Sequence, residues 1–306
     1  MKLNLLCLFI LLPALCFADA PTLKFTAKVV NRNGNPIENA KVFVNFTGSK
    51  AKVIEGRTNK EGLFTATGST TPIGGVTVKK EGYYLSGYSF ENMIIEHLDE
   101  RKKGLLNRWQ PWNPIINIVL KEKKNPIPMY AKGTFGYIEA PALEEPIGYD
   151  LAKGDWVIPY GKGEKKDFIF VFRARYDGIK DWEASYSLTF SDRHDGIIEY
   201  YPDENDYSEY KWPYKAPQTG YKSEINRYKV FQPNGYSKTN YDKKRRYIFR
   251  IRTKVDDKGN IIKAKYGKLK NDIEFLPNKK ISFSYIFNPT GTRNLEYSGQ
   301  NLFTSD

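Results

Sequence analysis

Cysteine and histidine are scarce in this chain, and their scarcity narrows the chemistry it can perform. Among 306 residues there are only 2 Cys and 2 His. These are too few for a zinc site of the usual composition, a disulfide framework or a Cys-His nucleophile pair. A Gly-x-Ser-x-Gly nucleophile elbow is also absent from the sequence. We therefore expect no bound metal or cofactor and no catalytic residues, although a pair of distant carboxylates for glycoside hydrolysis stays open.

The sequence also lacks an apolar run long enough to cross a membrane. Its longest run, residues 5–17, has 13 residues, whereas a spanning helix needs about 20. This run follows one positive charge at Lys2 and ends at small residues, a pattern typical of a secretory signal peptide. We predict a signal over residues 1–18 and a periplasmic or extracellular mature protein. Because Cys7 and Cys16 both lie in this signal, the mature chain would contain no thiol.

Aromatic and basic residues are abundant. The chain is 15% aromatic and carries 48 Lys and Arg against 35 Asp and Glu, a formal net charge of +13. The aromatic content predicts a folded protein, since disordered chains lack the apolar surface that offsets the entropy of ordering. The positive charge favours an acidic partner, and for an exported protein we expect a surface glycan rather than nucleic acid.

The chain divides near residue 124, where a charged segment ends in a proline. We predict one domain over residues 19–124 and a larger one over residues 125–306. In the first part, Leu23, Phe25 and Ala27 alternate with polar residues, the period-two pattern of a half-buried strand. Six or seven such short segments, bounded by Gly, Pro and Asn, predict a small β-sandwich.

A sequence pattern in this first part is similar to a known family. It consists of three pieces in order: residues 34–37 (GNPI) with Ala40 and Val42, residues 58–59 with Gly62 and Phe64, and residues 80–83 (KEGY). In this it resembles the carboxypeptidase regulatory-like domain of transthyretin-like fold, although Asn59 stands where the family more often has Asp. The resemblance implies a seven-stranded, non-catalytic module of the kind attached to secreted enzymes, receptors and binding proteins.

The segment from residue 85 to residue 114 is too long for a plain connection between strands. Met93, Ile94 and Leu98, followed by Leu105 and Trp109, approximate helical spacing, so we expect a short helix across a sheet edge. Trp109 and Trp112 then have two interpretations. They could seal one end of the sandwich, or they could form a stacking platform for a ligand.

The second part also shows alternating strand patterns. Phe168, Phe170 and Phe172 alternate along one strand, and similar patterns recur to the end of the chain. We predict a larger β-sandwich or jelly roll, so the fold class is all-β. This part resembles only exported bacterial proteins without an assigned activity. The loop at residues 154–163 (GDWVIPYGKG) lacks the spacing of a phosphate-binding loop, and Trp156 and Tyr160 are its expected packing anchors.

Two features of the second part are candidates for binding. The tyrosine-rich residues 200–221, including Tyr210, Trp212 and Tyr214, have the composition of a recognition loop. The basic run at residues 243–246 is either a binding stripe or a charged strand end that prevents edge pairing. We expect an exported, non-catalytic protein that binds an acidic or neutral polysaccharide through exposed aromatics. A docking scaffold for a cell-envelope protein and a secreted hydrolase are the alternatives. The candidate binding residues are Trp109, Trp112, Trp156, Tyr160, Tyr210, Trp212, Tyr214, Lys244, Arg245 and Arg246.

Overall fold

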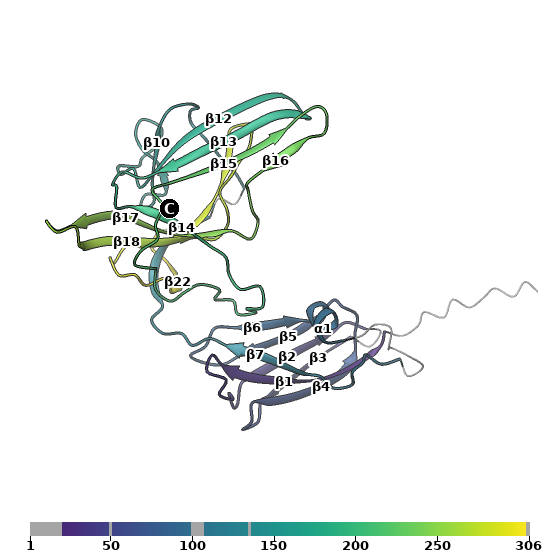
Figure 1. Cartoon of the computed structure of the whole chain (residues 1–306). Helices are drawn as coiled ribbons and strands as arrows, with labels where there is room; N and C mark the ends of the chain where they lie inside the picture. Colours follow the sequence, from purple (N-terminus) through teal and green to yellow (C-terminus); the bar gives the residue numbers. More distant parts are fainter. Residues whose placement is uncertain (1–19, 49–50, 99–106, 134–135, 304–306) are drawn as a thin grey trace, which may run out of the picture. The chain divides into compact units, whose positions relative to one another are not determined.

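The computed structural model describes residues 20–48, 51–98, 107–133 and 136–303 (Figure 1). In this part of the chain it has twenty-two β-strands and one α-helix. The expected all-β class is therefore confirmed. The predicted signal peptide, residues 1–18, lies outside the described residues.

The chain forms two compact units. The first ends at Glu122 and also includes Tyr207–Tyr210, while the second consists of Lys123–Asp206 and the chain from Lys211 onward. The sequence gives no signal that four residues from so late in the chain belong to the first unit. Each unit has its own hydrophobic core.

The first unit is a sandwich of two small sheets. One sheet has the strand order β4-β1-β7, with β1 and β7 parallel, and the other has the order β3-β2-β5-β6. The strands are β1 (Thr22–Asn31), β2 (Lys41–Phe46), β3 (Lys52–Arg57), β4 (Leu63–Ser69), β5 (Gly75–Lys79), β6 (Ser86–Ser89) and β7 (Ile115–Leu120). The apolar residues that alternate along β1 are fully buried, and the ring of Phe25 meets that of Phe90 edge to face at 5.9 Å.

The first two pieces of the sequence pattern meet in this unit. The buried Thr58 hydroxyl donates to the Ile37 carbonyl at 2.7 Å and accepts from the Ala40 amide at 2.9 Å. Asn59 closes the following turn by accepting from the Leu63 amide at 2.8 Å. Gly62 has φ +73°, and a Cβ there would lie 2.4 Å from the Val29 carbonyl oxygen. Glycine is therefore required at this turn by both backbone conformation and space.

The expected short helix is present as α1 (Phe90–His97). It begins where the Ser89 side chain accepts a hydrogen bond from the Asn92 amide, a standard N-cap. It ends at His97 because Leu98 is extended, so the helical spacing does not continue to Trp109. Leu105 lies outside the described residues.

The second unit has two six-stranded sheets and a smaller third one. Their strand orders are β11-β10-β12-β13-β15-β16, β14-β17-β18-β21-β8-β22 and β19-β20-β9. The strands are β8 (Ile127–Gly133), β9 (Ile138–Glu139), β10 (Ile147–Asp150), β11 (Asp155–Trp156), β12 (Phe168–Gly178), β13 (Asp181–Thr189), β14 (Gly196–Tyr200), β15 (Glu224–Phe231), β16 (Ser237–Thr239), β17 (Arg246–Val255), β18 (Ile261–Leu269), β19 (Glu274–Phe275), β20 (Lys280–Ser282), β21 (Ser284–Asn288) and β22 (Tyr297–Asn301).

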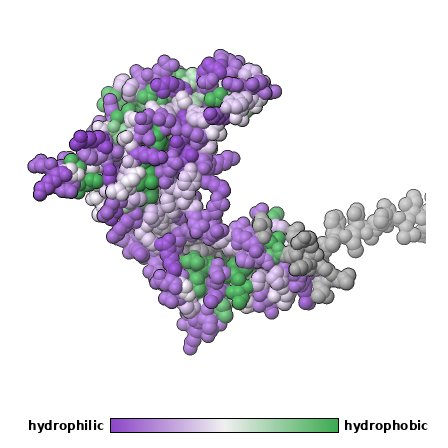
Figure 2. Space-filling view, viewed as in Figure 1, coloured by the Kyte–Doolittle hydropathy of each residue, from purple (hydrophilic) through white to green (hydrophobic). Residues whose placement is uncertain are grey.

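The core of the second unit lies between the two large sheets. Phe168, Phe170 and Phe172 of β12 point into it, and the Phe168 ring meets that of Phe249 on β17 at 5.2 Å. Tyr285 of β21 is also buried there. Because side chains alternate along a strand, the neighbouring Ser284 lies on the outer face of its sheet. In the view of Figure 2 the surface is mostly hydrophilic, with hydrophobic residues in small separate areas.

Candidate functional site

Four of the aromatic candidates are buried. For Tyr210 and Trp212 this corrects the expectation of exposed rings, whereas for Trp109 and Trp156 it agrees with the interpretation of these residues as packing residues. Trp109 and Trp156 are 1% and 6% exposed, and Tyr210 and Trp212 are 5% and 7% exposed. Large aromatic rings bury much apolar area, and their polar ends find partners inside the protein. Accordingly, the Trp156 indole donates to the Glu139 carbonyl at 3.2 Å. None of the four can present a ring face to a polymer in this structure.

Three aromatic candidates retain exposed surface, and each has a charged neighbour. The Trp112 ring has the Arg108 guanidinium 4.9 Å from its centre. The half-buried Tyr214 ring has the Lys124 ammonium at 4.6 Å. Tyr160 is 42% exposed, and its hydroxyl donates to Glu145. Trp112 belongs to the first unit, whereas Tyr160 and Tyr214 lie on two separate segments of the second.

The tyrosine-rich residues 200–221 do not form one open loop. Within the first unit, the Gly87 amide donates to the Tyr207 carbonyl at 3.1 Å, and the Glu209 amide donates to the Leu85 carbonyl at 2.9 Å. The segment thus adds a short antiparallel bridge beside β6. Tyr210 stacks on Tyr84 with their ring centres 4.5 Å apart. The interpretation of this stretch as an exposed recognition loop is wrong.

The positive charges of the basic run at residues 243–246 are largely balanced by acidic or aromatic partners within the second unit. Lys244 pairs with Glu204, and the Arg245 guanidinium donates to Asp272 at 2.9 Å with its side chain only 12% exposed. Arg246 lies over the Trp212 ring, 5.5 Å from its centre. These interactions leave no continuous stripe of free positive charge. Of the two interpretations of the run, the structure does not support the binding stripe.

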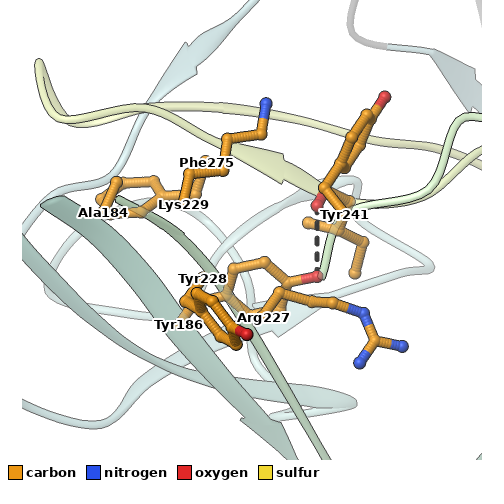
Figure 3. Close-up of a pocket in the computed structure, with 8 residues that line it drawn as sticks. Ala184, Tyr186, Arg227, Tyr228, Lys229, Tyr241 and Phe275 are labelled. Carbon is orange, nitrogen blue, oxygen red and sulfur yellow. Dashed lines mark hydrogen bonds between the residues drawn. The ribbon is translucent and has the colours of Figure 1, made fainter. Parts of the chain in front are cut away.

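A small polar recess lies beside this network (Figure 3). Figure 3 shows Lys229 and Tyr241 pointing the same way, with the Lys229 ammonium 4.3 Å from the Tyr241 ring centre, while Arg227 extends in the opposite direction. The Tyr186 hydroxyl donates to the Ile273 carbonyl at 3.2 Å. The cavity measures about 10 Å³, which is room for roughly one water molecule. It is too small for a ligand.

The charges behind this recess stabilise one another. The Arg227 guanidinium donates to Glu199 at 2.6 Å and to the Tyr247 hydroxyl at 3.0 Å, and Tyr247 donates to the fully buried Asp272. Burial alone would raise the pKa of Glu199, but the hydrogen bond and charge of Arg227 hold that pKa below its ordinary value. A buried network in which every charge is paired is a structural element rather than an open site.

A second buried group of charges fixes the chain directly after the loop at residues 154–163. Arg252 donates two hydrogen bonds of 2.7 Å to Asp167 and one of 3.1 Å to Asp150. Asp150 also accepts from the backbone amides of Glu164 and Lys165 at 3.1 and 3.0 Å. The carboxylates of Asp150 and Asp167 are therefore both hydrogen-bonded within the protein. Within the described ranges, no group of three or more His, Cys, Asp or Glu is arranged to hold a metal ion.

An open groove of about 360 Å³ lies elsewhere on the second unit. This volume is at the lower end of the range typical of small-molecule sites, about 300–1,000 Å³. The groove is lined by Ala131, Lys132, Gly133, Lys270, Ser284, Tyr285 and Tyr297. Gly133 and Ser284 are paired across β8 and β21, so the floor consists of strand backbone with small side chains. The Tyr285 ring turns into the core, where its hydroxyl donates to the Leu151 carbonyl at 2.8 Å.

Two polar groups in this groove have no partner among the described residues. They are the Ser284 hydroxyl and the ammonium of the exposed Lys270. The Lys132 ammonium, by contrast, donates to the Gly154 carbonyl, and the Tyr297 hydroxyl donates to the Gly299 carbonyl at 2.9 Å. A half-buried aromatic ring, a free hydroxyl and a free cation thus converge over a floor without bulky side chains.

Sequence reasoning missed this groove because its residues carry little signal. Gly133, Ser284 and Lys270 are ordinary in type and far apart in the chain, and only the pairing of β8, β21 and β18 brings them together. Gly133 is the last residue of β8, so it does not give the signal of a glycine in a strand interior.

Comparisons with known proteins give limited guidance. No family model matches the chain, and neither does any curated protein. Similar solved structures include 3-chlorocatechol 1,2-dioxygenase from Rhodococcus opacus 1CP, with 15% identity, TM-score 0.25, and 34% of this chain and 61% of that chain covered. A streptococcal ancillary pilin has 12% identity, TM-score 0.20, and coverage of 74% and 60%. The shaft pilin of Lactobacillus rhamnosus GG has 10% identity, TM-score 0.22, and coverage of 80% and 92%.

This chain therefore spans less than two thirds of the dioxygenase and of the ancillary pilin. TM-scores this low do not establish a shared fold with any one of these proteins. In the part of the chain that the structure describes, no helix is long and apolar enough to cross a membrane.

Proposed function

We propose that this is an exported binding protein that holds a saccharide, without converting it, in the groove formed by β8, β21 and the residue that follows β18. The observation that carries this proposal is the convergence of the unpartnered Ser284 hydroxyl and Lys270 ammonium beside Tyr297 and above Gly133. The buried carboxylates of Asp272 and Asp167, by contrast, are already paired with arginines of the second unit.

The shape of the groove suits a sugar ring. A pyranose has one face rich in C–H groups, which can lie against the ring of Tyr297, and a rim of hydroxyls that need hydrogen-bond partners. Ser284 can donate to or accept from such a hydroxyl, and Lys270 can donate. A site of this kind, open on one side, can accept one residue of a longer polymer without enclosing it.

The first unit is proposed as a carboxypeptidase regulatory-like module that carries no chemistry of its own. The arrangement of Thr58, Ala40 and Gly62 supports this, because two of the three pieces of the sequence pattern meet around one turn. The unit would then act as a stable spacer beside the binding unit. Export through the signal at residues 1–18 belongs to the same proposal.

The test is binding to an array of polysaccharides, followed by titration calorimetry with the polymers retained. We expect binding with no release of reducing ends. A Gly133→Val substitution places methyl groups over the groove floor, where a Cβ would lie 3.2 Å from the Ser284 Oγ, and should abolish binding. The matched control is Ser187→Val on the outer face of β13, which should bind normally.

Circular dichroism of both variants shows whether they fold as the parent protein does. Ser284→Ala serves as a second groove variant that removes the hydroxyl without adding bulk, and it should weaken binding by about fivefold or more. Full binding by folded Gly133→Val protein would contradict the proposal, and so would hydrolysis of the polymer.

A further inference from the structure

Building on the proposed saccharide site, we infer that the groove selects a sugar residue that carries a single anionic group, such as a uronic acid. Lys270 is the residue that would make this choice. It is exposed at the rim of the groove, and no carboxylate among the described residues pairs with its ammonium.

The charged residues among the described lining of the groove are all positive. This lining includes Lys132 and Lys270, and it contains no Asp or Glu. Although the Lys132 ammonium donates to the Gly154 carbonyl, a carbonyl does not neutralise it, so its charge still acts on the groove.

The buried acid Glu296, on the segment that leads into β22, already binds other groups of the protein. Glu296 is 1% exposed, and its two carboxylate oxygens accept from the backbone amides of Lys124 and Asn125 at 2.9 and 2.8 Å. Its side chain is therefore held by the backbone and is not offered to Lys270. A ligand carboxylate would supply the counter-charge that the protein does not.

The positions of Lys270 and Ser284 suit one ligand group. The Lys270 amide donates to the Ser284 carbonyl at 2.8 Å, so the two residues are fixed side by side on adjoining strands. A lysine is a compact point charge with rotatable donors, which matches one carboxylate better than a densely charged polyanion. With the ring against Tyr297, a carboxylate on the ring rim can receive hydrogen bonds from both Lys270 and Ser284.

The experiment compares uronate polymers with their uncharged counterparts. Polygalacturonate, alginate and hyaluronan are each titrated beside the carboxyl-reduced form of the same polymer, at low and at physiological salt. We expect the acidic form to bind at least about tenfold more tightly, as one charge-assisted hydrogen bond supplies. Lys270→Gln should remove most of that preference, so that the acidic and reduced polymers bind with similar affinity, whereas Lys270→Arg should retain the preference.

The matched control is Lys263→Gln, which removes one exposed positive charge from β18, the strand that Lys270 follows. It should change affinity less than about twofold, because exposed charges are screened by salt. Equal affinity of the parent protein for acidic and reduced polymers, with Gly133→Val abolishing both, would refute the inference and leave the saccharide site standing. Binding of neither form would overturn the saccharide site itself.

Discussion

Lys268 is buried in the second unit, and its burial should lower the free energy of unfolding by an amount that a single substitution can measure. Its side chain is 3% exposed, its ammonium donates to the Leu295 carbonyl at 2.7 Å, and it lies 5.1 Å from the centre of the Trp212 ring. Burial and the nearby Lys270 lower its pKa from 10.5 to about 7. We predict that Lys268→Met stabilises the protein at pH 6 and removes one component of its pH dependence.

The size of the effect follows from the shift in pKa. A difference of about 3.5 units corresponds to about 5 kcal/mol, which is the cost of keeping the buried ammonium charged below pH 7. Methionine cannot replace the hydrogen bond to the Leu295 carbonyl or the contact of the ammonium with Trp212, and their loss costs about 2 kcal/mol. Methionine is unbranched and fills the same space, so we expect a net gain of about 3 kcal/mol at pH 6.

The sign of the pH dependence is fixed by the same numbers. Between pH 7 and 10.5 the unfolded chain holds a proton on Lys268 that the folded chain has released, so stability rises with pH in this window. From pH 7.5 to 9.5 this single group contributes about 2 to 3 kcal/mol. In Lys268→Met that contribution is absent, and the two proteins converge in stability as the pH rises.

Urea unfolding at several pH values, followed by tryptophan fluorescence, measures this difference, and Trp212 is a reporter next to the substituted site. The control is Lys263→Met, an exposed lysine on the same strand, which should leave the pH dependence unchanged. A parallel pH profile for the parent protein and Lys268→Met, or a loss of stability at pH 6, would refute the reasoning.

Two further substitutions test the fold, each with a matched control and thermal or urea unfolding as the measurement. Gly62→Ala should lower the free energy of unfolding by about 2 to 3 kcal/mol, because its Cβ would lie 2.4 Å from the Val29 carbonyl oxygen. Gly82→Ala, with similar φ but open space, should lower it by about 1 kcal/mol. Equal losses of stability in the two variants would count against the close approach at Gly62. Asp272→Ala should cost about 3 to 5 kcal/mol because it leaves Arg227 and Arg245 buried without their shared partner. An exposed acid such as that at residue 257 should tolerate alanine, and a similar loss there would show that the network is not the cause.

Much of the fold could be predicted because it is encoded locally. Alternation in β1 and β12 marks which side chains enter the core, and the Asn59 to Gly62 turn is dictated by its own side-chain hydrogen bonds and backbone conformation. Such signals need only a few neighbouring residues. The short α1 was likewise expected, although its end at His97 was not.

The binding features could not be predicted because they depend on distant partners. The sequence predicts an exposed Trp212 ring, but in the structure Tyr200, Arg246 and Lys268 pack against this ring. Arg245 looked like part of a free basic run, but its partner Asp272 lies 27 residues further along the chain. Composition alone does not distinguish a charge that is free from one that is paired in the fold.

The most direct test of the central claim is to locate the bound saccharide on the protein. Hydrogen–deuterium exchange of the full chain, measured with and without the tightest polymer from the array, reports which backbone segments it protects. The groove predicts protection in β8 (Ile127–Gly133), β21 (Ser284–Asn288) and β22 (Tyr297–Asn301). Protection confined to the tyrosine-rich residues 200–221, or to the first unit, would contradict it.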